Sequence, residues 1–135
     1  MAEGYINHQI DTGWVTLNLI NGYGSVWGHV PQIRRIGDIV YLCGLATKTN
    51  WTQLPINSNT RYKLCDNVDA IFRPSYETIL QIEQINDAAV GFHMLRISND
   101  GEIIPCFRVS SNVTLDILNS NNYGLYVSYI GKPLN

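Results

Sequence analysis

Short alternating runs of apolar and polar side chains cover most of the chain, a period-two pattern that is typical of β-strands. In the first run, residues 14–20, the side chains of Val15, Leu17 and Leu19 share one face. Further runs predict strands at 32–36, 39–45, 78–85, 92–98, 102–109, 113–118 and 124–130. The run at 78–85 also fits a short helix. No stretch of ten or more residues combines a helical period with caps, so the pattern predicts an all-β fold, an antiparallel β-sandwich or barrel of jelly-roll type.

Turn residues separate these runs. Gly37 and Asp38 form a two-residue connection between the runs at 32–36 and 39–45, which predicts a tight antiparallel hairpin. Asp100 and Gly101 give a stronger signal between 92–98 and 102–109, because both residues tolerate a positive φ. Residues 21–25 are rich in glycine and are expected to form a loop, and residues 119–122 a polar turn.

The run at 39–45 is apolar on both of its alternating faces. Neither face should be left in water, so this strand is expected to be covered twice. In a β-sandwich the opposite sheet supplies one cover. The second cover is either a neighbouring subunit or another part of the same domain, and the pattern does not choose between them. Gly44 would allow another backbone to approach closely.

Composition narrows the class of protein. A chain of 135 residues predicts one domain with a real core. The net charge is −2 and the close basic residues are the pair Arg34 and Arg35, so a nucleic-acid partner is not expected. No apolar run approaches the roughly 20 residues that span a bilayer, and the N-terminus does not resemble a signal peptide, so we expect an unexported protein without membrane insertion. The odd number of cysteines, without CxxC spacing, predicts reduced thiols.

Four segments carry a resemblance to a known family through their combination and order: 13–17 (GWVTL), 35–44 (RIGDIVYLCG), 72–75 (FRPS) and 96–103 (RISNDGEI). They resemble the C-terminal head domain of receptor-binding tail or baseplate proteins from phages of Gram-positive bacteria, of which the lactococcal siphophages are the best-known relatives. The similarity spans roughly residues 12–130. It implies a homotrimeric β-barrel head at the distal tail tip of the virion, with saccharide sites near the subunit boundaries. Residues 1–11 are then an N-terminal arm or stem remnant, and residues 12–135 the head domain.

The sequence shows no pattern of catalytic residues. An enzyme should show a nucleophile with its base, paired carboxylates or a metal cluster. His8, His29 and His93 are far apart, and the Asp66/Asp69 pair lacks the rest of a calcium loop, so a solvated loop is the favoured interpretation there. We expect no enzymatic activity, no cofactor and no metal.

Saccharide binding needs an aromatic ring together with carboxylate, amide, arginine or histidine groups that bond sugar hydroxyls. Trp51 is the leading contact because it stands in the polar segment 47–60, where we expect it to be more exposed than a core residue; the alternative is ordinary packing under a loop. His93 interrupts an apolar run and serves either a groove between subunits or an interior hydrogen bond. The complete set of candidates is Trp51, Arg61, Tyr62, Asp66, Asp69, His93 and Arg108.

These expectations combine into one functional hypothesis. The chain is a homotrimeric phage receptor-binding head that binds a cell-wall polysaccharide or teichoic-acid component of the host reversibly and assembles with other tail or baseplate proteins. The alternatives are a structural baseplate or tail-fibre module, a lectin-like module outside any virus, and a polysaccharide-cleaving enzyme.

Overall fold

The computed structural model describes residues 10–52, 62–84, 93–107 and 114–134. Eleven short strands, one 3-10 helix and one short α-helix lie within these ranges. The first sheet has the order β1 (Val15–Thr16), β3 (Gln32–Ile36), β4 (Ile39–Cys43) and β11 (Ser128–Ile130). The second has the order β2 (Tyr23–Ser25), β5 (Leu45–Lys48), β10 (Asn122–Gly124) and β7 (Glu83–Gln84), and the third β6 (Thr78–Gln81), β8 (His93–Ile97) and β9 (Ile103–Phe107). The helices are η1 (Ala70–Phe72) and α2 (Leu115–Asn119).

Both predicted hairpins are confirmed. β3 pairs with β4 across Gly37, whose φ of 58° fits a tight turn. β8 pairs with β9, and the Ser98 hydroxyl accepts hydrogen bonds from the backbone N–H groups of Asp100 and Glu102 in the turn between them. Gly101 adopts a φ of 90°, as the Asp-Gly signal required.

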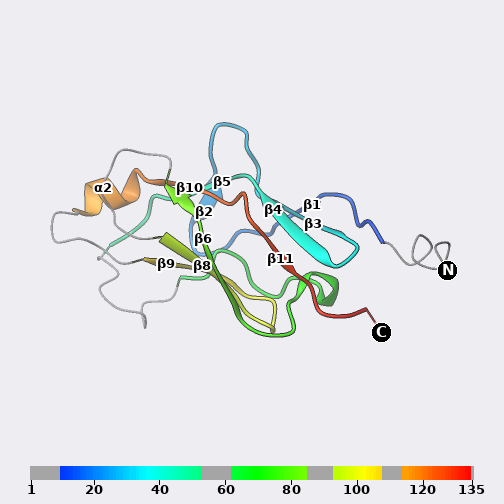
Figure 1. The fold of residues 1–135 in the computed structure, drawn as a ribbon. Helices are drawn as coiled ribbons and strands as arrows, with labels where there is room; N and C mark the ends of the chain where they lie inside the picture. Colours follow the sequence, from blue (N-terminus) through cyan, green and yellow to red (C-terminus); the bar gives the residue numbers. More distant parts are fainter. Residues whose placement is uncertain (1–9, 53–61, 85–92, 108–113, 135) are drawn as a thin grey trace, which may run out of the picture.

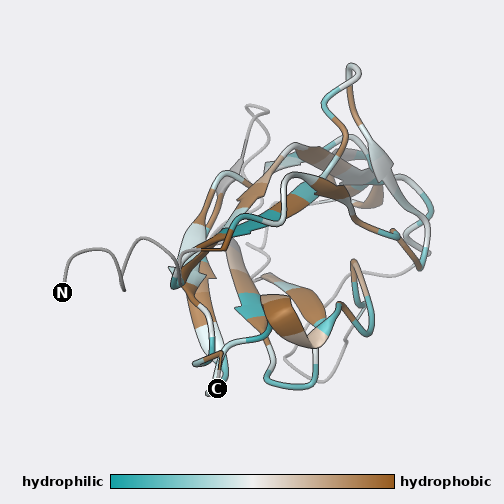
Figure 2. Cartoon of the chain, turned by 90° about the vertical axis from the view of Figure 1, so that its right-hand side faces the viewer, coloured by the Kyte–Doolittle hydropathy of each residue, from teal (hydrophilic) through white to brown (hydrophobic). Residues whose placement is uncertain are grey.

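Several chain segments bend from one sheet into the next. Gly44 has a φ of 107° between β4 and β5, and a Cβ there would lie 2.5 Å from the Pro31 Cα, so the expected close backbone approach is confirmed. Ile82 separates β6 from β7 in the same way, and residues 125–127 separate β10 from β11. Figure 2 looks along the molecule and shows the strands arranged around one interior. The prediction of an all-β antiparallel sandwich or barrel is therefore confirmed, with the predicted long strands divided at the corners.

Three local predictions are wrong. The strand predicted at 113–118 is replaced by α2, which buries Leu118 completely; so short a segment satisfies a period of two or of 3.6 equally well. The strand predicted at 14–20 pairs with β3 only through Val15–Thr16, and Leu19 then bridges to Cys65 beside the third sheet. The loop predicted at 21–25 contains β2, because only Asn21 and Gly22 form the turn.

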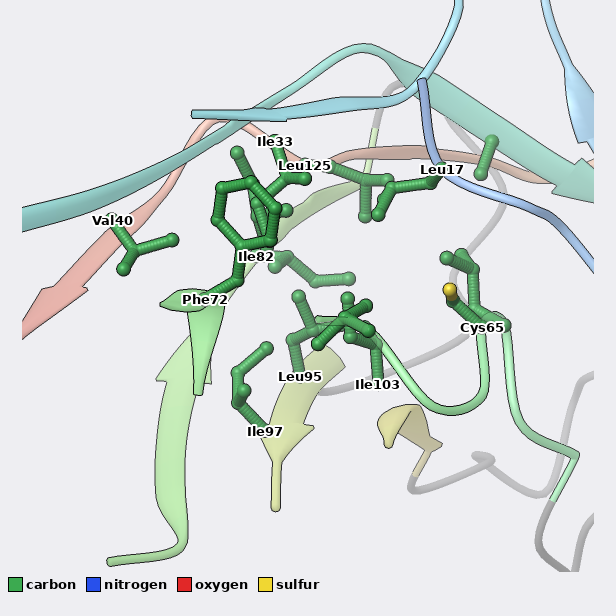
Figure 3. Packing of buried hydrophobic residues seen from close by; sticks show 14 of the residues in the cluster. Leu17, Ile33, Val40, Cys65, Phe72, Ile82, Leu95, Ile97, Ile103 and Leu125 are labelled. Atoms are coloured by element: carbon green, nitrogen blue, oxygen red, sulfur yellow. The ribbon is translucent and has the colours of Figure 1, made fainter. Parts of the chain in front are cut away.

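The core lies between the three sheets. In Figure 3, Ile33 and Val40 of the first sheet, Leu95 and Ile103 of the third, and Leu125 beyond β10 point toward one another. The second sheet adds Tyr23, Ala46 and Tyr123 to the same buried cluster. Exclusion of these side chains from water is the main force that holds the sheets together. No helix in the described ranges is long and apolar enough to cross a lipid bilayer.

Arg35 is fully buried on the core face of β3. Its guanidinium donates hydrogen bonds to three backbone oxygens, those of Gly37 at 2.8 Å, Ile71 at 3.0 Å and Lys132 at 2.8 Å. The β3–β4 turn, η1 and the C-terminal segment are thus joined by a single side chain. Ile10 also bonds this turn, through its backbone oxygen and the Gly37 N–H. We call this part of the molecule, where Ile10 and Gly131 both bond the β3–β4 turn (Figure 1), the terminal end.

The outward face of the first sheet is partly apolar. In β4, Val40 and Leu42 are buried beneath the opposite strands, whereas Tyr41 points away from the core and is 37% exposed. Ile39 pairs with Ile130 of β11, which is 71% exposed. The first of the two covers predicted for the run at 39–45 is therefore present, and the described part of this chain leaves the other face open.

Candidate functional site

Lys48 points into the interior of the barrel, which is unusual for a lysine. Side chains two residues apart on a strand share a face, and Ala46, two residues before it on β5, is fully buried. Lys48 is 3% exposed and lies opposite Tyr23 of β2. A cation therefore occupies the core face where β5 ends, at the end of the molecule that carries α2 (Figure 1).

Aromatic rings and neutral oxygens surround the Lys48 ammonium group. Its Nζ lies 4.7 Å from the ring centre of Tyr62, 5.1 Å from that of Trp51 and 5.7 Å from that of Tyr23. It donates hydrogen bonds of 2.5 Å to the Asn21 backbone oxygen and to Asn50 Oδ1. Cation–π attraction and these bonds stabilise the charge, while burial lowers the pKa of Lys48 from its ordinary value.

A small pocket of about 280 Å³ opens beside this ammonium group. Amide, hydroxyl and aromatic groups line it together with the cation; the lining residues are Asn21, Gly22, Lys48, Asn50, Trp51, Thr52 and Tyr62. We call it the Lys48 pocket. Its mixture of polar donors and ring surface is suited to a small polar ligand.

The local backbone fixes the pocket walls. Gly22 has a φ of 82°, and a Cβ at this position would lie 2.2 Å from the Asn50 side-chain amide, so glycine allows Asn50 to reach Lys48. Trp51 is held through its backbone, since its N–H donates to Asn119 Oδ1 at 2.8 Å and its carbonyl accepts from Asn119 Nδ2 at 3.2 Å. α2 therefore supports one wall of the pocket.

The structure brings together two of the residues proposed from the sequence. Trp51 and Tyr62 meet edge to face, with ring centres 5.0 Å apart, and both line the Lys48 pocket. The expectation that Trp51 is more exposed than a core residue is wrong, because it is only 5% exposed. Tyr62, Lys48 and the contact with Asn119 cover its ring and backbone.

The other proposed residues are not brought to this pocket by the described structure. Asp66 and Asp69 are exposed on the loop after Cys65 and are not among the pocket-lining residues. The His93 backbone pairs with Phe107 at the start of β8, and its side chain lies outside the described residues. Arg61 and Arg108 also lie outside them. A saccharide-binding role for each of the proposed residues stays a prediction.

Sequence reasoning missed Lys48 and Asn50. Lys48 lies two residues after the apolar Ala46, so in a strand both side chains share a face. A cation on the same strand face as an apolar residue was the available signal. The position of Asn21 beside it depends on the β2–β5 register, which no local pattern reveals.

A second and more open hollow of about 740 Å³ lies at the terminal end. It contains the 84% exposed Tyr76 and the exposed Asp38, together with Ser75, Thr78 and Ile130. None of the residues proposed from the sequence lines it. Within the described ranges, no three His, Cys, Asp or Glu side chains come together in a group that could hold a metal ion.

Neither family models nor curated protein sequences match the chain. Among solved structures it is similar to the receptor binding protein (gp15) of Listeria phage PSA, with a TM-score of 0.59 and 16% sequence identity. The likeness covers 98% of this chain and 72% of that chain. The described structure therefore has the fold of a phage receptor-binding protein, and the resemblance suggested by the sequence is confirmed at the level of the fold.

Proposed function

We propose that this chain is the head domain of a phage receptor-binding protein, located at the tail tip, and that it binds a saccharide on the host cell surface. The observation that carries the proposal is the fold shared with a phage receptor binding protein over nearly the whole chain. The Lys48 pocket supports a saccharide ligand, because it offers amide, hydroxyl and ammonium groups beside aromatic rings. The narrower likeness to lactococcal phage heads stays a prediction, since the solved neighbour comes from a Listeria phage.

We further propose that the head is a homotrimer which contacts other tail or baseplate proteins. The open apolar face of the first sheet, with Tyr41 and Ile130, supports contact with another protein surface. Light scattering on the purified chain tests this, with Ile130→Glu as the disrupting variant. Ile79→Glu is the matched control, because Ile79 is 51% exposed on β6 of the third sheet. A trimer that dissociates with Ile130→Glu and survives Ile79→Glu is expected; a monomeric wild type contradicts the proposal.

Several weak sites on one particle are sufficient for adhesion. A trimer carries three equivalent pockets, and a virion carries many heads, so effective concentration raises the overall avidity. Individual sites with about millimolar to micromolar affinity could then hold a cell. We propose reversible binding without cleavage, and time-dependent release of reducing ends from wall material would contradict that part.

Cell adsorption tests the binding function directly. The fluorescently labelled chain, displayed on multivalent beads, is incubated with a panel of Gram-positive bacteria that includes Listeria and Lactococcus strains. We expect selective binding that falls at least tenfold for Asn50→Ala in the Lys48 pocket and is unchanged for Tyr76→Ala in the other hollow. Absence of binding to any cells or extracted wall glycans would refute the proposal.

A structural tail module is the second candidate, because the same open apolar sheet face would serve a protein that only joins its neighbours. The two candidates differ in the adsorption experiment. A purely structural module would assemble through the first sheet, and its Asn50→Ala variant would leave phage adsorption intact.

A further inference from the structure

We infer that the Lys48 pocket recognises an anionic group of its ligand, a phosphate diester or a sugar carboxylate, through the Lys48 ammonium. This inference rests on the proposed function and specifies the chemistry that the same pocket selects. It begins from the charge of Lys48, which is buried without a carboxylate partner among the described residues.

Lys48 differs from the cations that form ion pairs in the described structure. Arg34 pairs with Asp11, Lys63 with Glu102, and Arg96 with Glu77. The hydrogen bonds of Lys48, in contrast, go to a backbone oxygen and a neutral amide oxygen. Burial of a charge is unfavourable unless an opposite charge or several polar groups compensate for it.

None of the described residues that line the pocket is acidic. Between residues 12 and 65 the chain contains a single acidic residue, Asp38. Asp38 lies in the hollow at the terminal end, on the β3–β4 turn and away from the α2 end (Figure 1). The same span contains Arg61 and Lys63 close in sequence to the pocket. The described lining therefore carries one positive charge, that of Lys48, and no negative charge, which favours an anion from outside the chain.

Arg35 shows that burial alone does not create such a site. It too has no carboxylate partner among the described residues, but Nε, Nη1 and Nη2 each donate to a backbone oxygen, and Arg35 lines neither the Lys48 pocket nor the hollow at the terminal end. Lys48 has three N–H groups and two hydrogen bonds within the described structure, and it lines an open pocket. One donor thus remains for a ligand.

The neighbouring groups complement an anion. Asn50 turns its amide oxygen to Lys48, which leaves its NH₂ group as a further donor. Thr52 adds a hydroxyl to the pocket lining. A volume of about 280 Å³ limits the bound portion to a small group, such as one phosphate with part of a sugar ring. Tyr62 and Trp51 hold the cation in place, so the donor is positioned before the ligand arrives.

The binding test uses defined small probes and the intact chain. Chemical shifts of the Trp51 indole and Asn50 side-chain amide are followed while glycerophosphoglycerol, a phosphate diester, or methyl glucuronide is added, with glycerol and methyl glucoside as neutral controls. We expect the Trp51 and Asn50 signals to shift with at least one anion, and the apparent affinity to fall as salt concentration rises. Phosphate and carboxylate probes separate the two sources of negative charge. Equal binding of neutral and anionic probes, or no response to either anion, would overturn the inference.

Two variants identify Lys48 as the donor. Lys48→Met should weaken anion binding at least tenfold, while Lys63→Met, which removes a partly exposed cation paired with Glu102, should not. If Lys48→Met does not fold, Asn50→Asp replaces it, because a carboxylate beside Lys48 occupies the anion position without removing the cation. This variant should fold and lose anion binding; retained binding in either folded variant would overturn the inference. If the wild-type chain adsorbs to cells but binds neither anion, the inference about anions fails and the proposed function stands. If it binds an anion but does not adsorb to cells, the proposed function fails and the inference about anions stands.

Discussion

Replacement of Arg35 should destabilise the whole domain, because this side chain joins three segments at the terminal end. Hydrogen bonds from a charged donor contribute about 1.5–3 kcal/mol each, which gives roughly 4.5–9 kcal/mol as an upper bound for three bonds. Arg35→Met keeps the alkyl stem and removes the buried charge. The variant no longer has the unfavourable desolvation energy of the guanidinium, which offsets part of the stability lost with the three hydrogen bonds. We expect the free energy of unfolding to fall by about 3–5 kcal/mol.

Urea unfolding followed by tryptophan fluorescence measures this change. If the free energy of unfolding falls by about 1.5 kcal/mol per molar urea, the urea concentration at the unfolding midpoint should fall by roughly 2–3 M, with an unchanged slope. Arg34→Met is the matched control, because the neighbouring Arg34 is only partly buried and pairs with Asp11 at the surface. If Arg35→Met lowers the midpoint no more than Arg34→Met does, the guanidinium does not hold the three segments together and the reasoning is refuted.

Three further predictions concern single contacts. The buried Tyr129 hydroxyl donates to the Phe72 backbone oxygen, and burial raises the pKa of Tyr129, so the stability that this group contributes is complete below pH ~10 and falls above it by up to about 1.4 kcal/mol per pH unit. Urea unfolding at pH 8–11 should therefore show a shallower loss of stability with pH for Tyr129→Phe than for the wild type. An identical loss in both proteins would contradict this. The Arg34 guanidinium lowers the pKa of Asp11 to about 2, so an NMR titration should show a return toward 3.8 in Arg34→Gln, and an unmoved pKa would exclude this cause. Gly22→Ala should lower the free energy of unfolding by about 1–2 kcal/mol, because position 22 has a positive φ, and should displace the Asn50 side chain. NMR should detect the displacement as shifted signals of the Asn50 side-chain amide. Unchanged signals would count against the close approach of Gly22 to Asn50.

Local chemistry explains which parts of the fold could be predicted from the sequence. The hairpins at Gly37 and Gly101 follow from neighbouring residues alone, since a short turn sets the register of both strands. The corners at Gly44 and Ile82 are less accessible, because the apolar pattern continues across them while the strand changes sheet. α2 could not be distinguished from a strand, because its few residues satisfy both periods.

The candidate site shows the same division between local and distant information. Trp51 was proposed because an aromatic residue in a polar segment suggests a ligand, and Tyr62 because its neighbouring segment could bring a hydroxyl contact to the same place. Their burial, and the role of Lys48 between them, depend on contacts with β2 and α2, which lie far away in the sequence. Asp66 was proposed on the same local grounds, but its exposed loop does not line the pocket. Residue type identified the relevant segment, and tertiary contacts decided which side chains meet.

The position of the first and last described segments has a practical consequence for binding experiments. Ile10 and Gly131 both bond the β3–β4 turn, whereas Trp51 is bonded to α2 at the opposite end of the molecule (Figure 1). A biotinylated tag attached next to Ile10 or Gly131 would therefore lie at the end of the molecule away from the Lys48 pocket. Heads immobilised on a sensor surface through such a tag would present their pockets to the solution in a uniform orientation.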